Sequence, residues 1–203
     1  MLERCISLKK IFGTLSLIMV LVLLSACGQK LDKPDDYDFE VQNFTYTNQD
    51  GKSVSLKDLE GKVWIADFIF TNCETVCPPM TNHMSSLQDN MKEAGLENVE
   101  IVSFSVDPTV DKPATLKKFG QKFDADFSNW HFLTGYKQSE IEEFAKTSFK
   151  TIVQKPKDDD QVTHGTAFYL VDQEGIVRTR YDGVNRSNDA DEKVIEDIKA
   201  LQQ

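Results

Sequence analysis

The sequence predicts a single α/β domain, and three observations support this fold class. Two apolar runs of strand length, 63–70 and 99–106, are each followed by a helical pattern. This alternation is typical of parallel strands joined by right-handed crossovers. Later in the chain, two β-rich runs, 166–171 and 176–181, flank a turn and precede an amphipathic helical pattern over 189–203. We therefore expect a parallel pair of strands, then an antiparallel hairpin and a closing helix.

A β-hairpin and a helical turn are predicted at the start of the domain. Asn48 to Gly51 is a turn signal between two alternating runs. The apolar residues on the two sides of this turn are expected to face one another: Phe39, Val41, Phe44 and Tyr46 against Val54 and Leu56. The segment 56–62 should form one helical turn that ends at Gly61.

Periodicity and end signals predict the elements between these regions. They are a helix over 80–95 with Met80, Met84, Leu87 and Met91 on one stripe, a helix over 113–119, a short strand over 130–133, and a helix over 139–147 with Ser139 as N-cap and Glu142 three residues on. The segment 150–162 is charged and weakly patterned. The complete order is that of a thioredoxin-like fold with an N-terminal β-hairpin and inserted elements.

The N-terminus has the pattern of a secretory signal. Three basic residues precede an apolar run over 11–24, and small residues then lead to Cys27. This site resembles a bacterial lipobox, which implies cleavage before Cys27 and lipidation of its sulfur; an uncleaved signal anchor is the alternative. We expect a lipoprotein-type signal peptide over 1–26, a polar tether over 27–38 and the folded domain over 39–203. The domain would lie on the extracytoplasmic side of a bacterial cell membrane.

The predicted mature chain is strongly acidic. The whole sequence has a net charge of −10, and segment 1–26 carries Arg4, Lys9 and Lys10 against Glu3, or +2, which leaves −12 for the rest. This charge argues against nucleic acid as a partner and against electrostatic adhesion to anionic lipid. Attachment to the membrane must then come from the anchor.

Two cysteines dominate the candidate chemistry. Of the four in the sequence, Cys5 would leave with the signal and Cys27 would carry lipid, so Cys73 and Cys77 would be the free thiols of the mature chain. They follow an apolar strand and precede a helix, where backbone N–H groups and the helix dipole favour thiolate. A metal site, a redox pair and a structural disulfide all remain open. In a thioredoxin-like fold, the loop before the later hairpin approaches the cysteine motif, and here that loop contains His164.

Several motifs together resemble the SCO/SenC family. They are Phe70-Thr71-Asn72-Cys73-x-x-x-Cys77-Pro78, Ser105-Val106-Asp107-Pro108 followed by Asp111 and Pro113, Trp130-x-Phe132-Leu133-Thr134-Gly135, and His164 before the strand 167–171. The family consists of membrane-tethered, thioredoxin-like proteins that handle copper during cytochrome c oxidase assembly. The resemblance implies copper ligands at Cys73, Cys77 and His164, and a partner oxidase subunit that carries the CuA site. The usual family tether is an uncleaved helix, from which the lipobox departs.

The residues are chemically suited to copper. Thiolates suit Cu(I), and an added imidazole gives a two-sulfur, one-nitrogen set that can also hold Cu(II). Structural zinc normally has four protein ligands and fits less well. Asp107 is expected to flank the site as a hydrogen-bond acceptor behind a ligand. By contrast, His83 and His131 are expected to be packing or surface residues, and Met80, Met84 and Met91 core residues.

Two other functions were weighed against copper handling. A thiol–disulfide oxidoreductase could use Cys73 and Cys77 to reduce the cysteines of the oxidase subunit before metallation, with a thiol reductant as a further partner. Dedicated oxidoreductases of this fold use Cys-x-x-Cys, however, and this chain has one residue more. A peroxidase would need a proline in the Thr71 to Cys73 loop, and this loop has none. We therefore expect an assembly factor without classical enzyme activity, while a reductase activity remains the alternative.

Overall fold

A six-stranded sheet forms the centre of the domain in this computed structural model, which describes residues 33–185 and 190–203. The strand order is β1-β10-β9-β4-β5-β6. β4, β5 and β6 are parallel, whereas β9 is antiparallel to both β4 and β10, and β1 is antiparallel to β10. The bounds are β1 Phe39–Glu40, β4 Val63–Ile69, β5 Val99–Ser105, β6 Trp130–Leu133, β9 Ala167–Val171 and β10 Ile176–Asp182. The parallel strands and the later hairpin confirm the predicted thioredoxin-like fold class.

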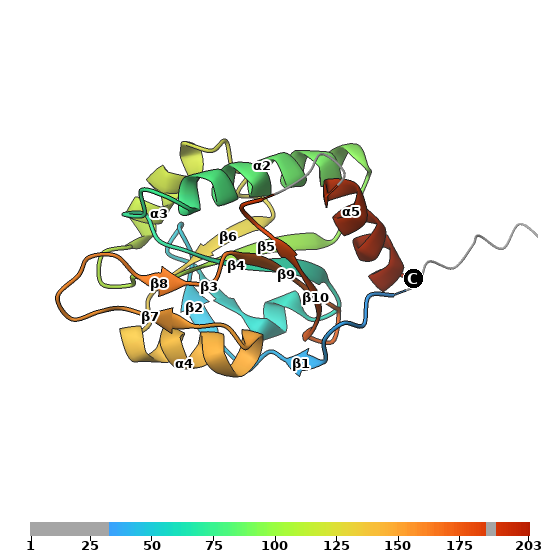
Figure 1. The fold of residues 1–203 in the computed structure, drawn as a ribbon. Helices are drawn as coiled ribbons and strands as arrows, with labels where there is room; N and C mark the ends of the chain where they lie inside the picture. The colour runs from blue at the N-terminus through green and yellow to red at the C-terminus, as the bar shows by residue number, and fades with distance from the viewer. Residues whose placement is uncertain (1–32, 186–189) are drawn as a thin grey trace, which may run out of the picture. The chain divides into compact units, whose positions relative to one another are not determined.

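Helices cover both faces of this sheet (Figure 1). α2 and α5 lie on one face and α4 on the other, while α3 packs beside β6. The helices are α2 Cys77–Glu93, α3 Pro113–Gln121, α4 Gln138–Phe149 and α5 Ala190–Leu201. Two small antiparallel pairs complete the domain: β2 Thr45–Thr47 with β3 Ser53–Ser55, and β7 Val153–Gln154 with β8 Thr163–His164. A short 3-10 turn, η1 Leu56–Leu59, follows β3.

β4 is buried along its whole length, because helices cover both faces of the sheet. Phe68 stacks on Phe104 of β5 and also meets Phe149 of α4, so this face of β4 points to the α4 layer. Successive side chains of a strand point to opposite faces. Asp67, next to Phe68, therefore points to the α2 layer. Its neighbour across the strand pair is Ser103.

The predicted N-terminal hairpin is confirmed only in part. Its turn and its second half are present as β2 and β3, which pair from Thr45 with Ser55 to Thr47 with Ser53. The placement of Phe39 in this hairpin was wrong, because Phe39 pairs with Val177 at the edge of the central sheet. Val41 likewise donates its N–H to Gly175 O beside the β9–β10 turn. A free sheet edge competes for an extended segment, and a local alternation pattern does not reveal that competition.

Three further local predictions are corrected. α2 begins at Cys77 rather than at residue 80, because prolines are tolerated in the first helical turn. α4 begins after Lys137, whose N–H is accepted by Glu140 Oε2, so Ser139 and Glu142 do not form the predicted cap. The segment 150–162 contains β7, which was not predicted. The last helix is confirmed from Ala190 onwards; its predicted start at residue 189 lies outside the described residues.

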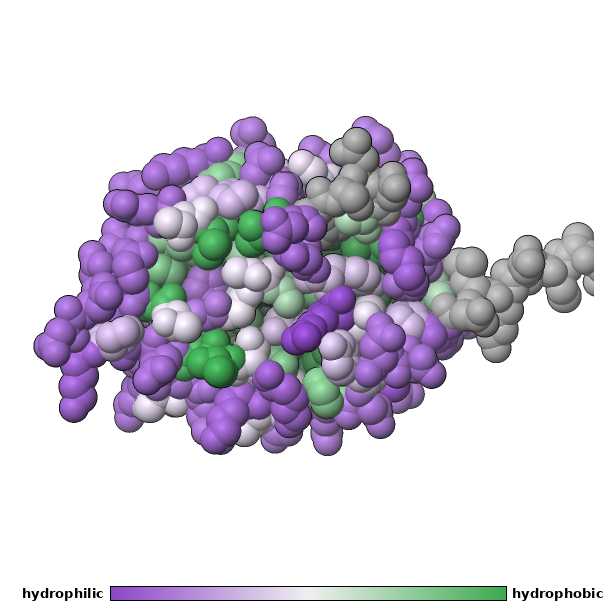
Figure 2. Space-filling view, viewed as in Figure 1, coloured by the Kyte–Doolittle hydropathy of each residue, from purple (hydrophilic) through white to green (hydrophobic). Residues whose placement is uncertain are grey.

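The surface of the domain is mostly polar, and the segment before β1 is hydrogen-bonded to β10. Figure 2 shows hydrophilic residues around the rim of one face and less polar residues towards its middle. The chain contacts the sheet shortly before β1: Tyr37 donates its N–H to Arg178 O at 2.9 Å, and Thr179 donates to Asp36. None of the described helices is both long and apolar enough to cross a bilayer. The predicted signal peptide, Cys27 and the first part of the tether lie outside the described residues.

Candidate metal centre

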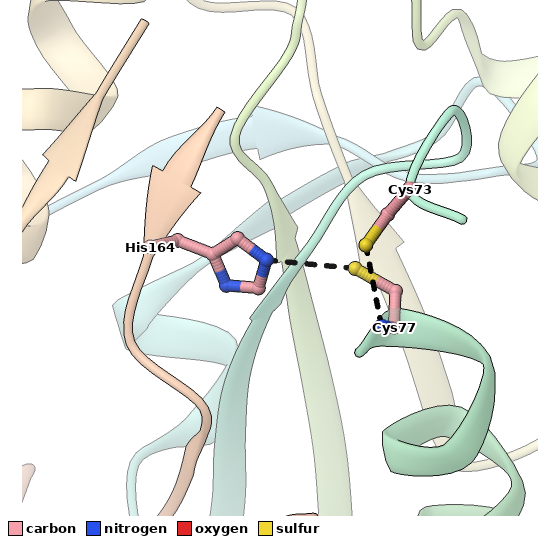
Figure 3. Close-up of side chains that lie close together, drawn as sticks. All are labelled: Cys73, Cys77 and His164. Carbon is pink, nitrogen blue, oxygen red and sulfur yellow. Dashed lines mark hydrogen bonds between the residues drawn. The ribbon is translucent and has the colours of Figure 1, made fainter. Parts of the chain in front are cut away.

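Cys77 lies at the first position of α2, and the local sequence directs its N–H toward Cys73. The first N–H groups of a helix have no partner within the helix. Here Pro78 and Pro79 have no N–H, and Met80 donates to Val76 O. The remaining donor, Cys77 N–H, points to Cys73 Sγ at 3.3 Å. The sulfur of Cys73 therefore caps α2, as Figure 3 shows.

The two cysteines are electrostatically distinct. Hydrogen bonds from the Cys77 thiol, from His164 and from the Cys77 and Thr75 N–H groups hold the pKa of Cys73 far below its usual value, although burial opposes this shift. The pKa of Cys77 is raised, because its thiol donates to Cys73 and because the side chain is fully buried. One proton therefore stays on Cys77 while Cys73 is a thiolate at neutral pH.

His164 reaches the cysteines from the β7–β8 hairpin. It lies in β8, where it pairs with Val153, so it is in a short strand rather than in the predicted loop. Its Nδ1 is 2.9 Å from Gly165 O, so Nδ1–H donates to the carbonyl. In the neutral imidazole Nε2 keeps its lone pair, whereas in the imidazolium Nε2–H can also donate to a cysteine sulfur. Nε2 lies 3.5 Å from Cys77 Sγ (Figure 3). The edge-to-face contact with Phe70, at 5.7 Å between ring centroids, fixes the plane of the imidazole.

The three side chains predicted as ligands thus converge. Their ligand atoms, Cys73 Sγ, Cys77 Sγ and His164 Nε2 or Nδ1, all lie within 4.8 Å of one another. Both cysteines are buried free thiols and His164 is half-buried. Among the residues that the structure describes, this is the one cluster of at least three histidine, cysteine or acidic side chains close enough to share a metal ion. Two soft sulfur atoms and one imidazole nitrogen suit copper better than magnesium or calcium.

A buried carboxylate anchors the loop that carries Cys73. Asp111 accepts hydrogen bonds from Thr71 Oγ1 at 2.5 Å and from Ser105 Oγ at 2.6 Å, and the Thr71 N–H also points to it. These contacts tie the residue two positions before Cys73 to the loop after β5. In the sequence Asp111 is a lone acidic residue between two prolines, which is too weak a signal to predict this role.

Asp107 was predicted to accept a hydrogen bond from a metal ligand. In the structure its carboxylate contacts Thr109 and Lys155. Its carboxylate accepts from Thr109 and forms an ion pair with Lys155 Nζ at 2.6 Å. Lys155 follows β7, so the pair attaches the hairpin that carries His164 to the loop after β5. A second link joins Asn72, directly before Cys73, to Asp160 and Gln161 of the same hairpin. The hydrogen bond from a ligand to Asp107 stays a prediction.

The other candidate ligands have contacts of their own. His83 Nδ1 is 2.9 Å from Gly183 O, and His131 Nε2 is 3.2 Å from Glu100. Met80, Met84 and Met91 are buried within the hydrophobic core, as their helical spacing predicted. One polar residue near the site was missed: Asp67 is fully buried in β4. The available signal was a single carboxylate in an otherwise apolar strand.

A strand-to-helix cysteine pair and a histidine from the β7–β8 hairpin define a thioredoxin-like protein with a two-sulfur, one-nitrogen site. The family model described as SCO1/SenC matches residues 32–203. A curated relative, the SCO1 protein homolog of Bacillus subtilis, is 52% identical over 191 residues, which are 94% of this chain and 97% of the relative. The chain belongs to the SCO1/SenC family.

Solved structures of related proteins agree with this assignment. A SCO1/SenC family lipoprotein from Bacillus anthracis has a TM-score of 0.78 and 51% identity, over 82% of this chain and 96% of that one. BsSco, a Sco-family cytochrome c oxidase assembly protein with an identified disulfide switch, has a TM-score of 0.77 and 53% identity, over 85% and 99%. Copper-bound ScoI of Bradyrhizobium japonicum has a TM-score of 0.65 and 29% identity, over 80% and 99%.

Proposed function

We propose that this chain binds copper, as Cu(I) or Cu(II), through Cys73, Cys77 and His164, and that it loads or prepares the CuA centre of a cytochrome c oxidase subunit. The observation that carries the proposal is the convergence of the three ligand atoms within 4.8 Å. The family assignment and the copper-bound relative support the choice of metal. The name of the BsSco relative, an oxidase assembly protein, supports the choice of partner.

A copper titration of the reduced protein tests this proposal. The wild type should bind one copper tightly per chain and show thiolate-to-Cu(II) charge-transfer absorption. His164→Ala should lose this absorption and weaken binding by about 100-fold or more, since loss of a group that merely supports a ligand already costs about 10–100-fold. His131→Ala is the matched control, because His131 pairs with Glu100 instead of a cysteine. A reduced wild-type protein without a tight copper site would refute the proposal.

A second candidate function is reduction of a disulfide in the same oxidase subunit. The observation that favours it is the division of roles between the slightly exposed thiolate of Cys73 and the buried thiol of Cys77. The Cys73 thiolate would attack the partner disulfide, which forms a mixed disulfide and releases one partner thiolate. Cys77, after losing its proton, would then attack Cys73 Sγ and release the second. The partner gains two electrons, this chain is left with a Cys73–Cys77 disulfide, and an external thiol reductant must restore it.

The membrane attachment proposed for this chain is a lipid on Cys27, which would hold the domain on the extracytoplasmic side of a bacterial cell membrane. The lipobox-like sequence before Cys27 and the related lipoprotein from Bacillus anthracis support it. Cells fed a labelled fatty acid should incorporate the label into the wild type and not into Cys27→Ala. A wild-type protein that takes up no label and keeps residues 1–26 would favour an uncleaved anchor.

A further inference from the structure

Asp67 is a fully buried carboxylate in the central strand β4. It lies in β4, six residues before Cys73, and its side chain is fully buried. Neither Oδ1 nor Oδ2 has a hydrogen bond of ordinary geometry, and only the nearby Ser103 hydroxyl interacts with the carboxylate as a donor, which lowers its pKa. Burial of a carboxylate without compensation is costly, so an unpaired carboxylate in a core strand is unexpected on grounds of stability alone. The fold does not need this charge, since the residues around it in β4 are apolar.

The position of Asp67 relates it to the candidate metal centre. Its side chain points to the α2 layer, opposite to Phe68, and α2 begins with Cys77. The nearest polar residue across the strand pair is Ser103, whose Oγ accepts the indole N–H of Trp130 at 2.9 Å. Besides Ser103, the groups that interact with Asp67 are those of the site: the carboxylate acts against ionisation of Cys77 and interacts favourably with the protonated form of His164. Burial raises the pKa of Asp67 to about 7.

We propose that Asp67 is a specificity-determining residue of the copper site, because its unpaired carboxylate favours the more highly charged Cu(II) over Cu(I). The inference rests on the proposed function and deepens it. Two thiolates and a neutral imidazole leave a net charge of −1 around Cu(I) and 0 around Cu(II). A negative charge behind the ligands therefore interacts more favourably with the Cu(II) form by one unit charge. Inside a protein the effective dielectric constant is lower than in water, so this difference is not fully screened.

The contacts of Asp67 distinguish it from the other buried carboxylates near the site. Asp111 is neutralised in part by hydrogen bonds from Thr71 and Ser105, and Asp107 by Lys155. Asp67 has only the weak interaction with the Ser103 hydroxyl, so its charge is compensated less than theirs. A bound cation would supply the compensation and would favour the ionised carboxylate in return.

The test compares Cu(II) and Cu(I) affinities of the full chain with those of Asp67→Asn at pH 8, by competition with chelators specific for each ion. Asparagine has nearly the same shape without the charge. A buried charge in the layer of the ligands acts at an effective dielectric constant of about 20 rather than that of water, so we expect the Cu(II)-to-Cu(I) affinity ratio to fall about tenfold. For the one-electron couple, with the electron supplied by an external donor in a mediated titration, tenfold corresponds to a rise of about 59 mV.

Asp197→Asn is the matched control. Asp197 is also a buried carboxylate in the α2 and α5 layer, but its oxygens contact Tyr181 and Lys193. The Asp197→Asn variant should leave the Cu(II)-to-Cu(I) affinity ratio unchanged. Asp67→Ser, a second neutral variant, should reproduce the shift and covers the case that Asp67→Asn does not fold.

The outcomes separate this inference from the proposed function. A lower ratio in both Asp67 variants, with an unchanged ratio in Asp197→Asn, supports it. Normal copper binding with an unchanged ratio, or equal losses for both ions, overturns the role of Asp67 and leaves the proposed function intact. A wild type that binds no copper refutes the proposed function and this inference with it.

Discussion

Cys77→Ser is expected to lose tight copper binding, by about 10³-fold relative to the wild type. Structural metal sites with several protein ligands gain about 10–16 kcal/mol in total, so one of three ligands accounts for about 4 kcal/mol, which is about 10³-fold in affinity. A serine hydroxyl is a hard, protonated oxygen and does not replace a thiolate toward copper. Copper titration with a competing chelator measures the loss.

Cys73→Ser should weaken copper binding to a similar extent, but the two variants should differ in the metal-free protein. The Cys73 sulfur is the thiolate at neutral pH, because it accepts hydrogen bonds from the start of α2 and from the side chains of Cys77 and His164. Cys77→Ser keeps the backbone N–H and supplies a hydroxyl donor. We therefore expect thiolate ultraviolet absorption at pH 7 in the wild type and in Cys77→Ser, and none in Cys73→Ser. Equal absorption in both variants would contradict the assignment of the thiolate to Cys73.

These cysteine variants abolish metal binding and disulfide exchange alike, so they do not separate the two candidate functions. His164→Ala does, because His164 is a metal ligand in the first function and unnecessary for exchange in the second. Loss of copper binding with preserved reduction of a partner disulfide would show that the two activities use different parts of one site. Loss of both would mean that His164 also maintains the Cys73 thiolate, whose pKa it lowers.

The sequence predicted the part of the site that local signals encode. A buried strand ending at Cys73 and prolines after Cys77 specify a strand-to-helix junction, and the structure has one there. His164 required a different argument, since it lies far along the chain and only the order of elements places it beside the cysteines. The structure brings it to 3.5 Å from Cys77. This prediction therefore depended on the topology together with the resemblance to the SCO/SenC family, and not on any local pattern around His164.

The remaining features depend on long-range contacts that a single sequence does not reveal. β7 is two residues long and exists because Val153 and Gln154 pair with β8. Asp107 was expected to support a ligand, yet it pairs with Lys155, a residue from a segment without a recognisable period. Phe39 lies at the edge of the sheet because one edge of β10 is available there to pair with β1. In each case the competing partner lies nine or more residues away, beyond the range of periodicity and capping signals.

The charge of Asp67 should also be visible in the stability of the metal-free protein. Burial raises its pKa to about 7 in the folded state, from 3.8 for an unperturbed carboxyl. Between these two values the folded state binds more protons than the unfolded state, so stability falls as the pH rises from about 4 to about 7. The Asp67→Asn variant has no carboxyl group at this position, so its stability should not show this fall with pH. The variant should match the wild type near pH 4 and exceed it at pH 8 by about 2–4 kcal/mol, from about three pKa units at 1.36 kcal/mol each.

Urea unfolding of the reduced, metal-free proteins at pH 4.5 and pH 8 measures this difference. Asp67→Ser separates charge from packing: it should show the same gain between the two pH values, offset by a constant loss for its smaller side chain. A difference between Asp67→Asn and the wild type that is the same at both pH values would contradict an ionised, uncompensated carboxylate in β4. If the predicted gain is found, the metal-free protein is less stable because of a charge that a bound cation would compensate. Copper should then stabilise the wild type more than Asp67→Asn at pH 8, because only in the wild type does the bound cation compensate a destabilising buried charge.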